Sequence, residues 1–279
     1  MKIAIFTSGG DCAGMNPALK TFVETCYQKE ITPYFIYDGL EGLIDNDIHQ
    51  AFHSDVAGII FKGGTIIRSS RSTRFYEKKY RELAYKNLLF HGIEKLIVLG
   101  GDGSFQALNI FYEEYKIPFV GIPSTIDNDI FGTEYCLGVD TALNVIRQAV
   151  DDIRDTASSF KRGFIIETMG RNCGYLALVS AMTCGAEICI IPEITYDLNS
   201  IKTRLSKQIT EGRKYLIAVV AEGSNIAHSL EDWCQSELNL EARTSKLGYI
   251  QRGGNPTVYD RLMASEFTFF ALQKLITEF

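Results

Sequence analysis

Two aspartates, Asp127 and Asp129, lie two residues apart in the stretch PSTIDNDIFGT at residues 123–133. The stretch follows an apolar run at residues 117–122, which we interpret as a buried strand. Two like charges at this spacing repel each other and are poor strand formers. One carboxylate could take a proton from a hydroxyl group while the other binds Mg²⁺, which would relieve the repulsion. An Asx-rich surface turn explains the same residues without any chemistry.

Two glycine-rich turns also follow predicted strands, and both could bind phosphate. They are TSGGD at residues 7–11 and GGDGS at residues 100–104. Glycines let backbone N–H groups approach a phosphate closely, and Asp102 in the second turn could hold Mg²⁺. The first turn matches neither GxGxxG nor a Walker A motif, which disfavours ordinary NAD enzymes and P-loop enzymes. The alternatives are a tight strand–helix turn for the first and, for Asp102, an aspartate that complements a helix dipole.

Several arginines lie near glycines or predicted strand ends, where they could bind an anion. They are Arg71, Arg162, Arg171, Arg243 and Arg252. Arginine binds phosphate bidentately, although each of these residues taken alone is better explained as a solvated surface side chain. The net charge of −6 gives no sign of a nucleic-acid partner. Anionic substrates would therefore need positive charge that is concentrated at one site.

The composition is that of an ordinary globular protein and excludes several classes. Apolar residues make up 46% of the 279 residues, and no apolar segment is long enough to span a membrane. The N-terminal apolar run is too short for a signal peptide, so we expect a cytoplasmic protein. Seven cysteines without Cys-x-x-Cys spacing disfavour a disulfide framework or a zinc site. Four scattered histidines disfavour a histidine-based hydrolase.

Short apolar runs alternate with helix-like segments along the chain. Strands are predicted at residues 2–6, 33–37, 95–99, 119–122, 164–167, 188–191 and 215–221. Helices are predicted at residues 17–28, 104–114, 139–156, 174–183, 199–210 and 228–238, with a last helix at 257–279. This alternation predicts an α/β fold, with two Rossmann-like three-layer α/β/α domains whose sheets are mainly parallel. Asn16 before Pro17 is predicted to cap the first helix, and Gly92 and Gly212 to end two others.

Taken together, the motifs closely resemble the 6-phosphofructokinase family, from the first predicted strand to the last helix. The matching segments are TSGGDCAGMN at 7–16, GGT at 63–65, GGDGS at 100–104, TIDNDIFGT at 125–133, MGR at 169–171, PE at 192–193 and LGYIQRGG at 247–254. The resemblance implies a glycolytic enzyme of the bacterial ATP-dependent type, and a homo-oligomer that we expect to be a homotetramer. It also implies a nucleotide-binding domain at residues 1–137 plus 252–279 and a sugar-phosphate-binding domain at residues 138–251.

The family transfers the γ-phosphoryl group of ATP to the 1-hydroxyl of fructose 6-phosphate with the help of Mg²⁺, giving fructose 1,6-bisphosphate and ADP. By resemblance, Asp127 is the general base, and Asp102 holds Mg²⁺ with the assistance of Asp129. Thr125 and Arg171 support the transferring phosphoryl group. The residues expected to line the nucleotide phosphates are Gly10, which is also predicted to be catalytic, and Arg71, Gly103 and Ser104.

The resemblance also assigns the sugar-phosphate site. Met169, Gly170 and Glu222 are expected to face the sugar, next to Thr125, Asp127 and Arg171. Tyr249 and Arg252 are expected to hold its 6-phosphate. Arg162 and Arg243 are expected to reach that phosphate from a neighbouring subunit.

The residues at positions 103 and 124 bear on the phosphoryl donor. Pyrophosphate-dependent relatives commonly have Asp at the place of Gly103 and Lys at the place of Ser124. Gly103 leaves room for ATP and Ser124 brings no cation, so ATP is the expected donor. A pyrophosphate-dependent enzyme, a sedoheptulose 7-phosphate kinase and a truncated regulatory subunit remain alternatives. A lipid or NAD kinase shares the GGDG turn but does not account for TIDND, MGR and QRGG together.

Three departures from bacterial relatives are visible in the sequence. Tyr249 replaces their usual histidine. The positions that match their effector site include the cations Lys20, Arg154 and Arg213 but also Glu24, His53 and Glu211, which predicts little response to ADP or phosphoenolpyruvate. The chain ends after its last predicted helix, where these relatives continue, and this predicts a less covered sheet edge or core surface.

Overall fold

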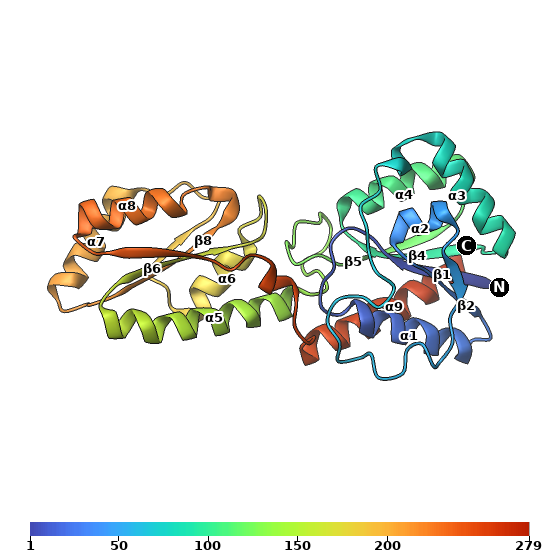
Figure 1. Ribbon diagram of the computed structural model, residues 1–279, viewed down its shortest axis with the longest axis horizontal. Helices are drawn as coiled ribbons and strands as arrows, with labels where there is room; N and C mark the ends of the chain where they lie inside the picture. The colour runs from blue at the N-terminus through green and yellow to red at the C-terminus, as the bar shows by residue number, and fades with distance from the viewer. Residues whose placement is uncertain (279) are drawn as a thin grey trace. The chain divides into compact units, whose positions relative to one another are not determined.

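The computed structural model describes residues 1–278, which divide into two compact units (Figure 1). Unit 1 contains Met1–Thr125, Ile130–Thr141 and the C-terminal part from Arg252. Unit 2 contains Ile126–Asp129 and Ala142–Gln251. The domain boundaries predicted from the sequence differ from this division at residues 126–129 and 138–141.

Unit 1 is built on a five-stranded sheet in the order β3-β2-β1-β4-β5. The strands are β1 Lys2–Thr7, β2 Thr32–Ile36, β3 Ile48–Gln50, β4 Lys95–Gly100 and β5 Phe119–Pro123. All neighbours run parallel except β2 and β3, which are antiparallel. The inner strands β1 and β4 are almost entirely buried, as their continuous apolar sequences predict.

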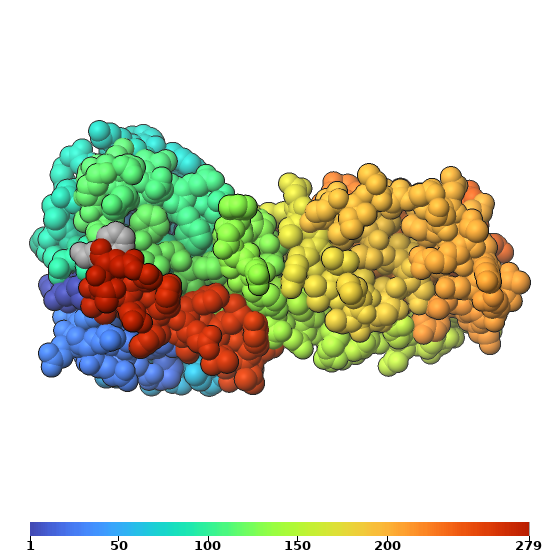
Figure 2. Space-filling view, turned by 180° about the vertical axis from the view of Figure 1, so that it is seen from behind, coloured from blue at the N-terminus to red at the C-terminus, as the bar shows by residue number. Residues whose placement is uncertain are grey.

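Helices cover both faces of this sheet. α1 (Met15–Gln28) and α9 (Val258–Glu278) lie together on one face, and Figure 2 shows α9 (red) exposed beside blue N-terminal residues. α2 (Gly39–Asp45), α3 (Lys78–His91) and α4 (Asp102–Tyr115) lie on the other face (Figure 1). On that face Phe6, Leu96 and Val98 of the sheet pack against Leu43 and Phe111 of the helices.

Unit 2 repeats this architecture around a four-stranded parallel sheet in the order β7-β8-β6-β9. The strands are β6 Gly163–Thr168, β7 Ile188–Ile190, β8 Leu216–Ala221 and β9 Ala242–Lys246. α5 (Val139–Phe160), whose first turn belongs to unit 1, and α6 (Tyr175–Cys184) lie on one face, and α7 (Leu198–Thr210) and α8 (Ala227–Leu238) on the other (Figure 1). Two three-layer α/β/α units with mainly parallel sheets confirm the predicted fold class.

The cap predicted for the first helix is wrong. α1 begins at Met15, after Gly14 with a left-handed φ of 100°, and no side chain caps it. The buried Asn16 instead donates to the carbonyl groups of Lys62 and Gly63 and accepts from the N–H of Ile66. A side chain that can both donate and accept is used here to hold a distant segment, which local sequence does not reveal. Gly92 ends α3 and Gly212 follows α7, both with positive φ, as predicted.

No helix among residues 1–278 is both long and apolar enough to cross a membrane.

Candidate active site

The turn after β1 joins two other segments of unit 1. The N–H of Gly9, which has a φ of 86°, donates to the carbonyl of Ser70 at 3.1 Å, and the Ser69 hydroxyl donates back to the Gly9 carbonyl at 3.0 Å. The Ser104 hydroxyl in the turn after β4 donates to that of Ser8 at 2.8 Å. The predicted phosphate-binding turns and the segment that carries Arg71 therefore lie side by side.

Gly10 lies against the guanidinium of Arg252. A Cβ at Gly10 would collide with Nη2 of Arg252, which forms an ion pair with Asp11 at 2.7 Å. Both charged residues line an open pocket of about 490 Å³. The other residues of its lining are Gly9, Gly63, Gly64, Thr65 and Ser69. The structure thus brings Arg252, predicted to bind the sugar phosphate, to the predicted nucleotide residue Gly10.

The turn after β4 is open to the outside. Gly101 precedes α4 in an extended conformation, and Asp102 begins the helix. A Cβ added at Gly101 or Gly103 would meet no atom within 4 Å. The exposed carboxylate of Asp102 accepts a hydrogen bond of 2.6 Å from Gln106. The N-terminus of this 14-residue helix therefore offers N–H groups, a favourable dipole and free space to an anion.

Ser124 at the end of β5 does not present its hydroxyl to a ligand. Ser124 is only 1% exposed, and its hydroxyl donates to the carbonyl of Ile122 at 3.0 Å. Its N–H donates to the carbonyl of Gly100, which ties the ends of β4 and β5 together. Thr125, the next residue, is half-buried and is the last residue of this part of unit 1.

In unit 2, one guanidinium lies between the two aspartates of the TIDND stretch. Arg171 Nε is 3.1 Å from Asp127 Oδ2, and its Nη1 is 3.7 Å from Asp129 Oδ2. The Asp127 side chain is only 8% exposed, whereas that of Arg171 is 61% exposed. Asn128 between them has a φ of 53°, which asparagine tolerates better than most residues. Arg171 therefore relieves the repulsion between the two carboxylates, which the sequence had led us to expect a metal ion to relieve.

The loop that carries Arg171 is held by Glu222 at the end of β8. Glu222 Oε1 accepts from the N–H of Gly170 at 3.2 Å and from that of Arg171 at 2.8 Å. Gly170 has a φ of 134°, and a Cβ there would collide with the carbonyl of Cys173. The N–H of Met169 donates to the side chain of buried Gln251, a residue that the sequence analysis did not single out although it lies in the QRGG motif.

Arg162 and Arg243 share one carboxylate in unit 2. Arg162 Nε is 3.0 Å from Glu241 Oε2, and Arg243 Nη2 is 2.7 Å from Glu241 Oε1. Arg162 directly precedes β6, and Arg243 on β9 pairs with Phe164 near the start of β6. Met169 directly follows the last residue of β6. A strand of this length spans about 20 Å, so these two arginines and Arg171 occupy opposite ends of the sheet. Tyr249 is 77% exposed.

The cations expected at the effector positions all have partners within the protein. Lys20 pairs with Glu24 at 2.5 Å, and Arg213 pairs with the buried carboxylate of Glu187. Arg154 donates to the carbonyl of Cys184. These contacts leave less positive charge for an anionic effector, and the weak response to effectors stays a prediction.

The carboxylates of the site also affect a neighbouring thiol and bear on metal binding. Burial raises the pKa of Cys173, and the charges of Glu193, Asp129 and Asp127 raise it further, so the thiol stays neutral near pH 7. Among residues 1–278, no group of three or more His, Cys, Asp or Glu side chains could hold a metal by itself. Mg²⁺ commonly takes one or two carboxylates together with phosphate oxygens, and the Mg²⁺ roles of Asp102 and Asp129 stay predictions.

Comparisons with known proteins cover nearly the whole chain. The family model "Phosphofructokinase" matches residues 2–275. The ATP-dependent 6-phosphofructokinase of Sulfurimonas denitrificans is 58% identical over 275 residues, which are 98% of this chain and 86% of the relative. That of a Sulfurovum species is 58% identical over 274 residues, 98% of this chain and 84% of the relative. The solved structure of phosphofructokinase from Saccharomyces cerevisiae is 32% identical with a TM-score of 0.95, and the match covers 100% of this chain and 42% of that one.

Proposed function

This chain belongs to the phosphofructokinase family, and we propose that it carries out the family's reaction with Asp127 as the base and the glycine turns of unit 1 as the nucleotide site. The enzyme is an ATP-dependent 6-phosphofructokinase, a glycolytic phosphotransferase with an alcohol group as acceptor. It transfers the γ-phosphoryl group of ATP to the 1-hydroxyl of fructose 6-phosphate, giving fructose 1,6-bisphosphate and ADP. The observation that carries the residue assignment is the shielded Asp127 carboxylate held by Arg171.

Asp127 is the proposed general base. As the 1-hydroxyl oxygen bonds to the γ-phosphorus, the bond to the β,γ-bridging oxygen breaks and the hydroxyl proton passes to Asp127. Its low exposure limits competition from water, and Arg171 fixes its orientation. Because the Arg171 side chain is largely exposed while Glu222 holds its backbone, the guanidinium can also contact the transferring phosphoryl group.

The nucleotide phosphates are proposed to bind unit 1. Gly103, Ser104 and the N-terminus of α4 supply N–H groups and space, Gly10 supplies a backbone N–H, and Arg71 supplies a positive charge. Thr125 is proposed to support the transferring group. Asp102 and Asp129 are the proposed Mg²⁺ ligands, and the ion would neutralise charge on the phosphate oxygens.

The sugar phosphate is proposed to bind unit 2 with help from further arginines. Met169, Gly170 and Glu222 would face the sugar, and Tyr249 and Arg252 would hold the 6-phosphate. Arg162 and Arg243 lie at the other end of the unit 2 sheet from Arg171, which supports their action on the sugar phosphate of a second copy. We therefore propose a homo-oligomer, expected to be a homotetramer. The binding roles of the two predicted domains and the cytoplasmic location stay predictions.

A donor comparison tests this function. Purified protein is assayed with fructose 6-phosphate and Mg²⁺ plus either ATP or pyrophosphate, and fructose 1,6-bisphosphate is measured with aldolase. We expect turnover with ATP at a rate at least about a hundredfold above that with pyrophosphate, as the open space at Gly103 favours the longer donor. Faster turnover with pyrophosphate would contradict the donor assignment, and turnover with neither would contradict the function.

A further inference from the structure

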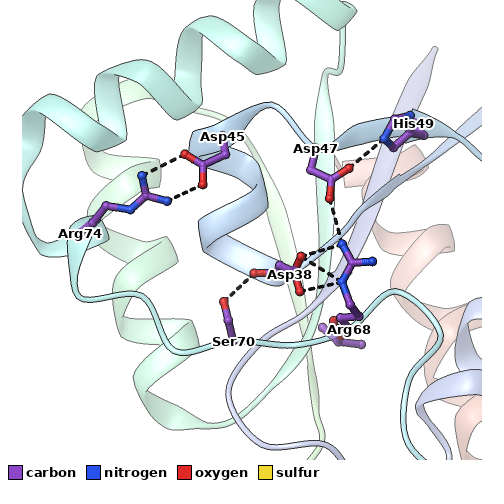
Figure 3. Close-up of polar contacts among 8 residues, drawn as sticks. Asp38, Asp45, Asp47, His49, Arg68, Ser70 and Arg74 are labelled. Carbon is purple, nitrogen blue, oxygen red and sulfur yellow. Dashed lines mark hydrogen bonds and ion pairs between the residues drawn. The ribbon is translucent and has the colours of Figure 1, made fainter.

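The segment Ser69–Arg71 lies between two arginines that are fixed by acidic residues. Arg68 donates through Nε and Nη2 to the carboxylate of Asp38, at 2.6–3.0 Å, and through Nη2 to Asp47 at 3.0 Å (Figure 3). Arg74 donates to Asp45 and to Glu41, both on α2. The two arginines thus attach both sides of the segment to α2 and its flanking turns.

Arg71 lies between these arginines and differs from both. It is exposed and forms no ion pair or hydrogen bond with any of residues 1–278. Three arginines therefore occur at intervals of three, and only the middle one keeps its charge available for a ligand. The acidic residues form ion pairs with the flanking arginines, and none of them forms an ion pair with Arg71.

The backbone of Arg68 is held in a conformation that costs free energy. Its φ of 58° is left-handed, a region that residues other than glycine, asparagine and aspartate rarely adopt. Its carbonyl accepts from the Thr7 hydroxyl at 2.6 Å, at the end of β1. Two contacts hold the side chain of Arg68: the bidentate bonds to Asp38, and the ring of Tyr37, whose centroid is 5.2 Å from the guanidinium carbon. By holding the side chain, these contacts stabilise the left-handed backbone conformation of Arg68.

Asp38 joins the ion pair to the phosphate-binding turn. Its N–H donates to the carbonyl of Ile67 at 2.9 Å, and its own carbonyl accepts from the Ser70 hydroxyl at 2.6 Å (Figure 3). The carbonyl of Ser70 in turn accepts from the N–H of Gly9. A continuous chain of hydrogen bonds therefore leads from the Arg68–Asp38 pair to the glycine turn after β1.

We propose that Arg68 is a positioning residue for the donor nucleotide. Together with Asp38 it fixes Ser69–Arg71 beside the turn after β1, so that Arg71 presents its cation to the phosphates of ATP. Arg68 itself does not touch the nucleotide. The inference rests on the proposed nucleotide site of unit 1 and adds the residues that hold that site in place. The surrounding charged groups are Asp47, which also accepts from His49, and the Arg74 pair on α2.

Kinetics of Arg68→Gln and Asp38→Asn test the proposal. Each change removes the charge pair. Asp38→Asn also keeps the length of the side chain and the bonds of its backbone to Ile67 and Ser70. We expect KM for ATP to rise about tenfold in both variants, as for the loss of a bidentate charge-assisted pair, with kcat and KM for fructose 6-phosphate within about twofold of the wild type. Arg68→Lys keeps one charged bond and should recover part of the ATP affinity.

Arg147→Gln is the matched control, because Arg147 is an exposed arginine that pairs with one carboxylate, Asp151, at 2.9 Å on α5. It should leave KM for ATP unchanged. Unchanged KM for ATP in Asp38→Asn, or an equal rise in both substrate KM values with a lower melting temperature, overturns the proposal. Titration calorimetry with Mg²⁺ and a non-hydrolysable ATP analogue tests the positioning role of Arg68 separately from the proposed activity. If the wild type shows no turnover but binds the analogue about tenfold more tightly than the two variants do, the proposed activity is refuted and the positioning role is supported.

Discussion

The two units of the chain offer different chemistry at the carboxyl ends of their parallel strands. In unit 1, the turn after β4 offers the N-terminus of α4 and open space, because Gly101 and Gly103 have no neighbour within Cβ reach. In unit 2, Arg171 lies between Asp127 and Asp129, and Glu222 fixes its backbone. A donor with several phosphate groups needs room and N–H groups, whereas proton transfer needs one oriented carboxylate.

This difference has a practical consequence for mutagenesis. Unit 1 should be sensitive to side chains that are added to its glycine turns, because they occupy space that a phosphate needs. Unit 2 should be sensitive to charges that are removed, because each carboxylate and guanidinium holds another in place.

Asp127→Ser removes the proposed base and should have the largest effect. We expect kcat to fall by a factor on the order of 10² or more, because the variant lacks the carboxylate proposed to take the hydroxyl proton, with modest changes in KM. Steady-state kinetics with ATP and fructose 6-phosphate measure this. Asp151→Ser, which removes an exposed aspartate that pairs with Arg147, is the control and should keep the wild-type kcat. A kcat near that of the wild type in Asp127→Ser would refute the assigned base.

Gly103→Asp tests the open space of unit 1. The fold should tolerate the change, because a Cβ at this position meets no atom within 4 Å and its φ is not positive. We expect kcat/KM for ATP to fall by roughly ten- to a hundredfold through repulsion and lost space, and the ratio of pyrophosphate to ATP use to rise. Gly103→Ala adds only a methyl group and should lose less. If both variants use ATP as well as the wild type, the turn does not set the donor.

Arg162→Gln and Arg243→Gln test the far end of unit 2. We expect KM for fructose 6-phosphate to rise about tenfold in each with little change in KM for ATP, because each would lose the charge-assisted bond that we propose it forms with the 6-phosphate. Glu241→Gln weakens the competing partner of both arginines and should lower KM for the sugar phosphate. A rise in the Glu241→Gln variant would show that this carboxylate orients the arginines and does not compete with the ligand.

The smallest predicted effect concerns pH and the ion pairs of unit 1. Hydrogen bonds from Arg68 lower the pKa of Asp38, and those from Arg74 lower the pKa of Asp45. A lowered folded-state pKa stabilises the fold above the ordinary aspartate value of about 3.9, and this contribution is lost as the pH falls below it. The melting temperature of Asp38→Asn should therefore lie below that of the wild type at pH 6, and the difference should shrink towards pH 3. A difference that is independent of pH would contradict the assignment.

Much of this architecture follows from the sequence, because buried parallel strands have continuous apolar sequences. All seven predicted strands are present. β3 and β9 were not predicted, because these edge strands, such as ARTSK in β9, lack an apolar run. α2 was not predicted, and of α3 only its end at Gly92 was predicted.

The candidate site was predicted less completely. The motifs gave the residues, but not the partners that lie far away in the sequence. Asp127 and Arg171 are 44 positions apart, and neither the pairing of Arg252 with Asp11 nor that of Arg162 with Glu241 has a local signal. The acidic partners of Arg68 went unnoticed for the same reason, since ion pairs between distant segments depend on the folded backbone.

The most direct test of the account is a single-turnover experiment with ATP labelled in the γ-phosphoryl group, Mg²⁺ and fructose 6-phosphate. We predict that wild-type protein moves the label to the 1-position of the sugar within one turnover and that Asp127→Asn, with the sugar phosphate still bound, does so on the order of 10² times more slowly. Label on another position, label released as inorganic phosphate, or equal rates for the two proteins would contradict it.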